Sequence, residues 1–278
     1  MASNKMVMYR IFRTVLGPIY RFWYRPTVIG RENIPNEGSF LIVGNHVHIM
    51  DQCNIIGSTK RRIHYMAKKE YFDPKYKEGK FPWFFRSAGC IPVDRAKKDH
   101  EAVDSAMDVL KEGHAIGLFP EGTRNGLKDK RAKEIFDQYI KDGDFDEFYK
   151  IVKKNKTSFV DYLEELYKSK KITKKEFLTN LGDCDRFLHE LIEKKVIKEK
   201  DYYDHLFLEF KFGAVSMANK TDSYLVPYAI TGDYKFRSKN LVVRIGKPFK
   251  ADDDLAKANE KLRKEITNLY KENLKNSK

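Results

Sequence analysis

Short apolar runs that stop abruptly at polar residues constrain the fold of this chain more than any other feature. Residues 39–44 end at Asn45 and His46, and residues 114–119 end at Pro120 and Glu121. Runs of this length and composition are typical of buried β-strands. Because segments with helical spacing alternate with them, the sequence predicts an α/β domain in which polar residues follow the strand ends.

Further runs complete this pattern. Strands are expected at residues 62–67, 89–94, 224–230 and 241–245, with Pro92 indicating an edge or a bulge in the second of these. Helices are expected at residues 100–112 and 253–273, and one or two short helices at residues 5–24, broken near Gly17 and Pro18.

The charge of the chain is strongly positive and unevenly distributed. The net charge is +14, and the first 31 residues contain Lys and Arg but no Asp or Glu. A field of this sign attracts phosphate groups, acidic carriers or anionic lipid. No nucleic-acid-binding signature is present, so nucleic acid is not an expected partner. Three widely spaced cysteines give neither a disulfide framework nor a zinc pattern, which fits a reducing cytosolic compartment.

Residues 1–28 are expected to form amphipathic helices at a membrane interface. Apolar residues recur there at helical spacing, with Arg10, Arg13 and Arg21 between them. The alternative is that this stripe packs on the protein's own core. No run of 18 apolar residues and no signal-peptide pattern is found, so we expect peripheral or monotopic attachment to the cytoplasmic face of a membrane.

Residues 128–207 differ in character from the rest of the chain. They are rich in Lys, Asp and Glu, lack proline, and repeat, because residues 163–177 match residues 188–202 at a constant offset. Each copy predicts a helix, a Lys-rich turn and the start of another helix. The sequence therefore predicts an all-helical insertion, which divides the α/β domain into residues 29–127 and 208–278.

His46 and Asp51 form the first candidate for chemistry. A histidine can take a proton from an alcohol, and a carboxylate on its other ring nitrogen fixes the tautomer. Four intervening residues allow a turn to bring Asp51 back to the imidazole. Two alternatives stay open, namely that Asp51 only caps a helix, or that His46, His48 and Asp51 bind a metal ion.

The turn at residues 119–125 is the second candidate. After Pro120, Gly122 allows close approach of the backbone, and Thr123 and Arg124 add donors, which together would cradle a phosphate. Glu121 is placed to hold a substrate hydroxyl or to fix Arg124. The alternative is an ordinary surface turn with a Glu–Arg pair.

Four motifs in this order resemble those of the glycerolipid acyltransferase family. They are residues 45–51 (Asn-His-Val-His-Ile-Met-Asp), 89–95 (Gly-Cys-Ile-Pro-Val-Asp-Arg), 119–125 (Phe-Pro-Glu-Gly-Thr-Arg-Asn), and 211–214 (Lys-Phe-Gly-Ala) followed by 226–228. The first and third look more like those of 1-acylglycerol-3-phosphate acyltransferases than of glycerol-3-phosphate acyltransferases. The resemblance implies a central mixed sheet flanked by helices.

The resemblance also implies a role for each matching residue. His46 would be the general base and Asp51 its partner. Arg95 and Arg124 would bind the acceptor's phosphate, and Lys211 would add positive charge there. Glu121, Gly122 and Thr123 would shape the acceptor site, with no metal.

Two departures from the family pattern stand out. His48 replaces the usual serine, which leaves the acceptor preference open. The helical insertion lies where the family has a short loop, and a lid, a docking site for an acyl carrier and a passive decoration all fit it.

The implied function is transfer of an acyl chain from acyl-CoA or an acyl carrier protein to lysophosphatidic acid, without a cofactor and beside anionic lipid. Alternatives are a glycerol-3-phosphate or other lysophospholipid acyltransferase. Two further alternatives belong to other classes: a non-catalytic lipid-binding protein, and a metal-dependent hydrolase using His46 and His48.

Overall fold

The structure is a computed structural model that describes residues 6–76, 81–94, 99–125, 149 and 157–275. The chain divides into two compact units. The first consists of Met1–Gly122 with Phe210–Lys278, and the second is Thr123–Glu209.

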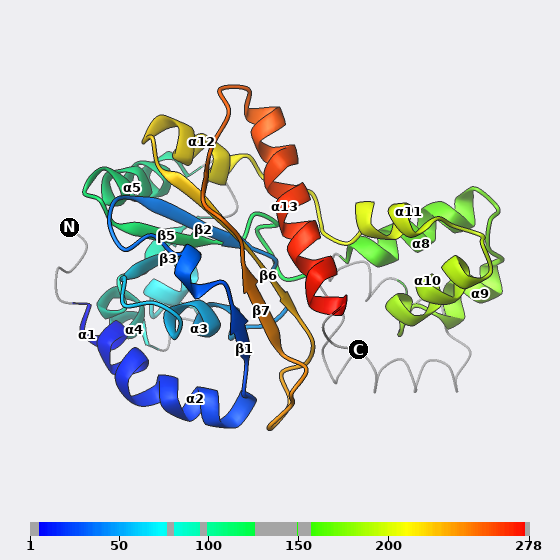
Figure 1. Cartoon of the computed structure of the whole chain (residues 1–278), viewed down its shortest axis with the longest axis horizontal. Coiled ribbons are helices and arrows are strands. Elements are labelled where there is room, and N and C mark those ends of the chain that lie inside the picture. Colours follow the sequence, from blue (N-terminus) through cyan, green and yellow to red (C-terminus); the bar gives the residue numbers. More distant parts are fainter. Residues whose placement is uncertain (1–5, 77–80, 95–98, 126–148, 150–156, 276–278) are drawn as a thin grey trace. The chain divides into compact units, whose positions relative to one another are not determined.

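A mixed sheet forms the centre of the first unit (Figure 1). Its strand order is β1-β7-β6-β2-β5-β3-β4, with β8 paired to β6. All neighbouring pairs are parallel except β6 with β7 and β6 with β8. The strands are β1 (Thr27–Ile29), β2 (Phe40–Gly44), β3 (Ile63–Lys68), β4 (Ile91–Val93), β5 (Ala115–Leu118), β6 (Tyr224–Thr231), β7 (Val242–Ile245) and β8 (Phe249–Lys250). The α/β fold with a mixed sheet is confirmed.

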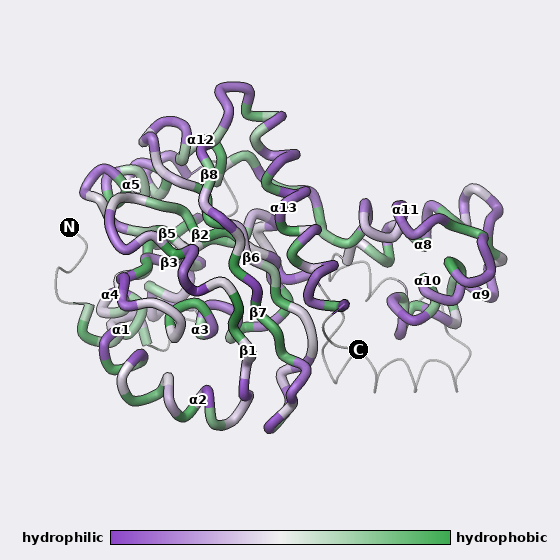
Figure 2. Tube along the Cα trace, in the orientation of Figure 1, coloured by the Kyte–Doolittle hydropathy of each residue, from purple (hydrophilic) through white to green (hydrophobic). Residues whose placement is uncertain are grey.

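Strand β2 occupies the middle of this sheet and is buried along its whole length. It pairs in parallel with β5 on one side and β6 on the other, so the carboxyl ends of these strands meet at one edge. A side chain at Gly44 would lie 2.5 Å from the ring of Tyr228, so only glycine fits there. The apolar residues concentrate in these strands (Figure 2).

Helices cover both faces of the sheet (Figure 1). One face packs against the N-terminal segment and α3 (Asp51–Ile56), through a buried cluster that includes Tyr9, Ile55 and Tyr65. The other contacts α5 (His100–Lys111), α12 (Gly213–Lys220) and α13 (Leu255–Lys275). Along the chain, a 3-10 turn at Arg31–Asn33 connects β1 to β2. A 3-10 turn at Lys69–Phe72 and helix α4 (Pro82–Ser87) lie between β3 and β4 in the sequence.

The N-terminal segment is helical from Val7 to Tyr24, but in three sections. Helix α1 (Val7–Ile11) continues into a π-helical turn (Phe12–Leu16) and then into α2 (Gly17–Tyr24). The expected break at Gly17 and Pro18 is thus a change of helix type. Proline is tolerated there because it lies in the first turn of α2.

Three strands differ from the sequence prediction. The edge strand expected at residues 89–94 is shorter, at Ile91–Val93, and Pro92 lies on an edge strand as expected. Strands β1 and β8 were not predicted, because they contain three and two residues and carry no periodic signal.

Helix pairs build the described part of the second unit. They are α8 (Ser158–Lys168) with α9 (Lys174–Thr179), and α10 (Cys184–Glu193) with α11 (Glu199–Asp204). The repeat is visible in the backbone, because Lys170 and Lys195 have φ of 59° and 58° at equivalent turns. Buried residues also match, as with Leu163 and Leu188, or Phe177 and Tyr202. Most of residues 126–156 lie outside the described part.

Candidate active site

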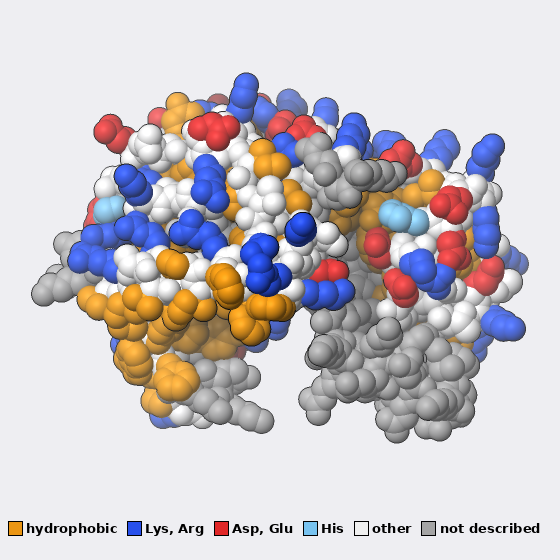
Figure 3. Space-filling model, turned by 60° about the horizontal axis from the view of Figure 1, so that its bottom comes forward, with side chains coloured by type: hydrophobic (Ala, Val, Ile, Leu, Met, Phe, Trp, Pro, Cys, Tyr) orange, Lys and Arg blue, Asp and Glu red, His pale blue; other side chains and the backbone are white. Residues whose placement is uncertain are grey.

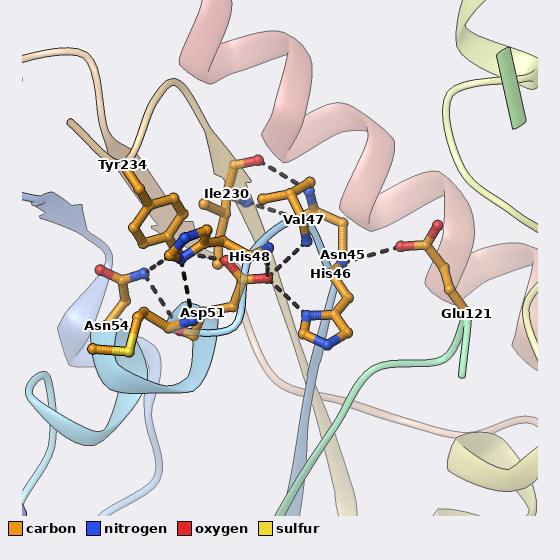
Figure 4. A network of polar contacts seen from close by, with 10 residues as sticks. Asn45, His46, Val47, His48, Asp51, Asn54, Glu121, Ile230 and Tyr234 are labelled. Carbon is orange, nitrogen blue, oxygen red and sulfur yellow. Dashed lines mark hydrogen bonds and ion pairs between the residues drawn. The ribbon is translucent and has the colours of Figure 1, made fainter. Parts of the chain in front are cut away.

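The imidazole of His46 is bonded to the carboxylate of Asp51. His46 lies in the loop that follows β2, and Asp51 is the first residue of α3. Nδ1 of His46 lies 2.8 Å from Oδ2 of Asp51 (Figure 4). A carboxylate only accepts, so Nδ1 carries the proton and Nε2, on the far side of the ring, presents a lone pair. The imidazole is 17% exposed, whereas Asp51 is fully buried.

The Asp51 carboxylate accepts four hydrogen bonds. Besides His46, the backbone amides of Val47 and His48 donate to Oδ2 at 2.7 and 2.8 Å. The hydroxyl of Tyr234 donates to Oδ1 at 2.5 Å. These donors compensate for the burial of the charge. Asp51 therefore does more than cap a helix, because it folds the loop around itself and orients the imidazole.

Tyr234 was not predicted from the sequence. It follows β6, and its oxygen also accepts a 2.8 Å hydrogen bond from the amide of Asn54. The side-chain oxygen Oδ1 of Asn54 in turn accepts a hydrogen bond from the Tyr20 hydroxyl at 2.8 Å. Burial, and next the charge of Asp51, raise the pKa of Tyr234 far above its usual value, so the phenol keeps its proton and donates.

Asn45 holds the start of the loop between β2 and α3 against β6. Its side-chain nitrogen donates to the Ile230 carbonyl at 3.0 Å, and its side-chain oxygen accepts from the Ile230 amide at 2.8 Å. This pair continues the pairing of β2 with β6 by one step beyond Gly44. The buried asparagine thereby fixes where His46 leaves the sheet.

The turn after β5 meets the same loop. Because β5 is parallel to β2, the residues that follow the two strands are neighbours. The ring of Phe119 stacks on the His46 imidazole, with centroids 3.9 Å apart and an interplanar angle of 12°. Oε1 of the buried Glu121 accepts from the His46 amide at 3.1 Å (Figure 4). Thus Glu121 contacts the backbone of His46.

Gly122 and Lys211 form the next layer of this turn. Gly122 has φ of +69°, and a Cβ there would lie 2.8 Å from Nζ of Lys211. The Lys211 amide also donates to the Pro120 carbonyl at 2.9 Å. The ammonium group is therefore held across the glycine, where it adds positive charge to the turn.

The described structure does not test the roles of three predicted residues at this site. Thr123 and Arg124 belong to the second compact unit. Arg95 lies outside the described residues. Their roles toward a phosphate stay predictions.

Asn125, the last residue of the third motif, has a structural role that was not predicted. Its side chain bonds Ser158 and the Leu206 carbonyl, joining the start of α8 to the residues after α11.

Neither His48 nor Cys53 is arranged as a catalytic group. The His48 ring stacks on Tyr234 with centroids 4.1 Å apart, and its Nδ1 accepts from the Met50 amide at 3.2 Å. Burial raises the pKa of Cys53 to about 12, which keeps it a thiol. Within the described residues, no group of three or more His, Cys, Asp or Glu side chains is arranged to hold a metal ion.

The sequence matches one family model. It is that of the family called Acyltransferase, and the match covers residues 25–231, which include both motifs of the site and the helical insertion. The chain belongs to the acyltransferase family.

Curated proteins of the same name from several bacteria are similar to part of this chain. The 1-acyl-sn-glycerol-3-phosphate acyltransferase of Bacillus subtilis is 32% identical over 118 residues, which cover 42% of this chain and 57% of that protein. The enzyme of the same name from Borreliella burgdorferi is 33% identical over 110 residues, which cover 38% and 41%. The chain thus spans less than two thirds of the length of either relative.

Solved structures also resemble this chain. One of them is the 1-acyl-sn-glycerophosphate (LPA) acyltransferase PlsC from Thermotoga maritima, with a TM-score of 0.49 and 19% sequence identity. The match covers 92% of this chain and 80% of that chain.

Proposed function

We propose that this acyltransferase moves a fatty acyl chain from a thioester donor to the free hydroxyl of 1-acylglycerol-3-phosphate, which yields phosphatidic acid. The observation that carries the proposal is the imidazole of His46, held by Asp51 through Nδ1 with Nε2 as a base. The names of the relatives support this choice of acceptor. A non-catalytic lipid-binding protein has no need of such a buried carboxylate behind a histidine.

The reaction follows from this geometry. Nε2 of His46 removes the proton from the glycerol hydroxyl as its oxygen attacks the thioester carbonyl carbon. The new C–O bond forms, the C–S bond breaks, and the leaving thiolate takes the proton back from the imidazolium. Thiols have a pKa of about 8.5, so the thiolate leaves readily. A general base contributes about 10²–10⁴-fold, and holding both substrates together contributes much of the remainder.

The acceptor's phosphate is assigned to the basic residues around the turn. Lys211 lies across Gly122, beside the turn that carries Glu121. Arg124 and Arg95 are proposed to add guanidinium groups, which bind phosphate in a bidentate manner. The donor is proposed to be coenzyme A or an acyl carrier protein, without a cofactor.

Attachment to a membrane surface is part of the proposal. Seven apolar residues of the N-terminal helical segment are between 41% and 59% exposed, and they recur at helical spacing: Val7, Ile11, Val15, Leu16, Ile19, Phe22 and Trp23. They therefore do not pack on the described core, whereas Tyr9 and Tyr20 do. Figure 3 shows hydrophobic side chains gathered below a row of Lys and Arg. This pattern suits an anionic bilayer interface.

The proposed membrane surface extends beyond the N-terminal segment. Phe236 is 56% exposed and its ring contacts that of Trp23, with centroids 4.6 Å apart. Trp83 of α4 is 58% exposed, and α4 contacts α1. Among the described helices, none combines the length and the apolar run needed to cross a bilayer. The proposed attachment is monotopic, on the cytoplasmic face, which the free cysteines fit.

One assay tests the function and separates its alternatives. Purified chain is given radiolabelled acyl-CoA or acyl-carrier protein, each with lysophosphatidic acid, glycerol-3-phosphate or another lysophospholipid. We expect transfer to lysophosphatidic acid, lost in His46→Ala and retained in the matched surface control His100→Ala. Full activity of His46→Ala would remove this histidine from the mechanism, and no transfer with any pair would reject the enzyme proposal.

A further inference from the structure

Asp51 is a buried carboxylate with its charge in neutral surroundings. The titratable groups that face it are the imidazole of His46, the thiol of Cys53, and the phenols of Tyr20, Tyr65, Tyr228 and Tyr234, while the imidazole of His48 stacks on Tyr234. Burial raises the pKa of each phenol and of the thiol, so these groups stay neutral. The carboxylate is thus held by the hydrogen bonds described above, and the one to His46 joins it to a group that can carry a positive charge.

The two carboxylate oxygens are not equivalent. Oδ2 accepts from His46 and from two backbone amides, all within the loop that Asp51 closes. Oδ1 accepts from Tyr234, which is 183 residues away in the sequence. The phenol of Tyr234 therefore acts with the donors to Oδ2 to set the rotation of the carboxylate about its Cβ–Cγ bond, and with it the direction in which the imidazole is held.

Tyr234 is itself held firmly. Its oxygen accepts from the Asn54 amide, and its ring lies between that of His48, 4.1 Å away, and that of Tyr24, 5.6 Å away, centroid to centroid. A network of four hydrogen bonds then runs from Tyr20 through Asn54, Tyr234 and Asp51 to His46. It begins on α2, which carries the proposed membrane face.

The loop that carries Tyr234 is docked on the same helix. The Arg237 amide donates to the Trp23 carbonyl at 2.6 Å, and the Arg237 guanidinium lies over the Phe22 ring at 5.6 Å. Gly232 closes the base of the loop, where a Cβ would lie 1.8 Å from the Asn240 carbonyl oxygen. The end of α2 and residues 232–241 are therefore joined by backbone, ring and cation–π contacts.

We propose that Tyr234 is the positioning residue of this active site. Its hydroxyl orients Asp51 through Oδ1, Asp51 orients His46, and α2 supports Tyr234 through Tyr20 and Asn54. The inference rests on the proposed function for its catalytic consequence. It adds to that function a dependence of the base on the N-terminal helix.

Removing the hydroxyl has a directional effect on the base. Without the donor to Oδ1, the carboxylate holds more negative charge toward the imidazole and binds imidazolium more tightly. The free base then forms only at higher pH, so the acidic limb of the rate profile moves to higher pH. A tyrosine that merely fills space would lower stability without moving this limb.

The experiment compares three Tyr→Phe variants of the full chain in lipid–detergent micelles. They are Tyr234→Phe, Tyr20→Phe and the control Tyr228→Phe, whose hydroxyl is buried and finds no hydrogen-bond partner among the described residues. We expect Tyr234→Phe to lower kcat by about 10- to 100-fold, as loss of a charge-assisted hydrogen bond would. The KM for donor and acceptor should stay within about twofold, and the acidic limb should move by about half a pH unit.

Tyr20→Phe should show the same changes at smaller size, and Tyr228→Phe should match the wild type. The second readout needs no turnover. In ¹⁵N-histidine-labelled protein, the His46 resonance is assigned by its loss in His46→Ala, and its Nε2 should titrate at higher pH in Tyr234→Phe.

Unchanged kcat, pH limb and titration in Tyr234→Phe would overturn the inference. So would lowered stability with an unmoved limb, which is the result for a purely structural tyrosine. If the wild type transfers no acyl group, the proposed function fails, while the His46 titration still decides the role of Tyr234.

Discussion

The backbone amide of His46 donates a 3.1 Å hydrogen bond to Oε1 of Glu121, 75 residues further along the chain. This bond joins the loop after β2 to the turn after β5 at the shared edge of two parallel strands. The Glu121 carboxylate therefore interacts with the protein backbone. It sets the position of His46 relative to the turn after β5.

Substitution of Glu121 tests this role in positioning His46. Glu121→Ala leaves the His46 amide without its acceptor, so the free energy of unfolding should fall by about 1–3 kcal/mol and acyl transfer by more than about tenfold. Glu121→Gln retains an acceptor oxygen and should keep activity within a few-fold. Chemical denaturation and initial rates give both values. Equal loss in the two variants would show that the charge, and not the hydrogen bond, is what matters.

Asp51→Asn should abolish the base while leaving the fold. An asparagine can turn its amide nitrogen toward Nδ1 of His46, which moves the imidazole proton to Nε2. The expected loss in kcat is about 10²–10⁴-fold. The same amide nitrogen would then face the backbone amides of Val47 and His48, which donate to Oδ2 of Asp51, so the thermal midpoint should fall in Asp51→Asn as well as in Asp51→Ala. A kcat within about tenfold of wild type in a folded Asp51→Asn protein would contradict the proton assignment.

Local sequence patterns predicted the parts of the site that lie close together in the chain. His46 and Asp51 are five residues apart, and a strand end followed by a helix start is enough to bring them together. The turn at Glu121 was expected at the same site from the resemblance of the motifs, and it lies there because the parallel strands β2 and β5 end at one edge. The α/β class followed from apolar runs that alternate with helical segments, whereas the mixed sheet was implied by the resemblance.

The remainder depends on contacts between distant residues. Asn45 bonds Ile230, 185 residues away, and Tyr234 bonds Asp51, yet no periodicity marks either one. One signal was present, because Tyr234 closely follows an apolar strand run that ends at the same sheet edge as β2. The residues that follow the apolar run 224–230, Tyr234 among them, are therefore marked as site candidates in the same way as those that follow the run 39–44.

Helical spacing also left the N-terminal face unresolved. This segment is apolar on two sides, with Tyr9 and Tyr20 inward and Ile19 and Trp23 outward. A single stripe in the sequence cannot separate the side that meets the core from the side that meets solvent.

The outward side should govern binding to lipid vesicles. In Ile19→Ser with Phe22→Ser, roughly 3 kcal/mol of apolar burial is lost, so partitioning should weaken by about 10²-fold. Co-sedimentation with vesicles containing phosphatidylglycerol measures this. Val196→Ser, which changes an exposed apolar residue of the helical insertion, is the control and should bind as the wild type does. Undiminished binding of the double variant would contradict the assignment of this membrane face.

Gly122 offers a way to separate backbone strain from the placement of Lys211. Gly113 and Gly122 have φ of +79° and +69°, but a Cβ at Gly113 would meet nothing within 4 Å, whereas at Gly122 it would meet Lys211. An alanine at either position should lower the free energy of unfolding by about 1–2 kcal/mol, because left-handed backbone disfavours a side chain.

Only Gly122→Ala displaces the ammonium group, so it alone should raise the KM for lysophosphatidic acid, by about tenfold for one lost charged contact. The KM for the acyl donor should not change, because the proposed role of Lys211 is toward the phosphate. Equal acceptor KM values in Gly113→Ala and Gly122→Ala would show that Lys211 is not at the acceptor's phosphate, and would leave that role to the guanidinium groups of Arg95 and Arg124.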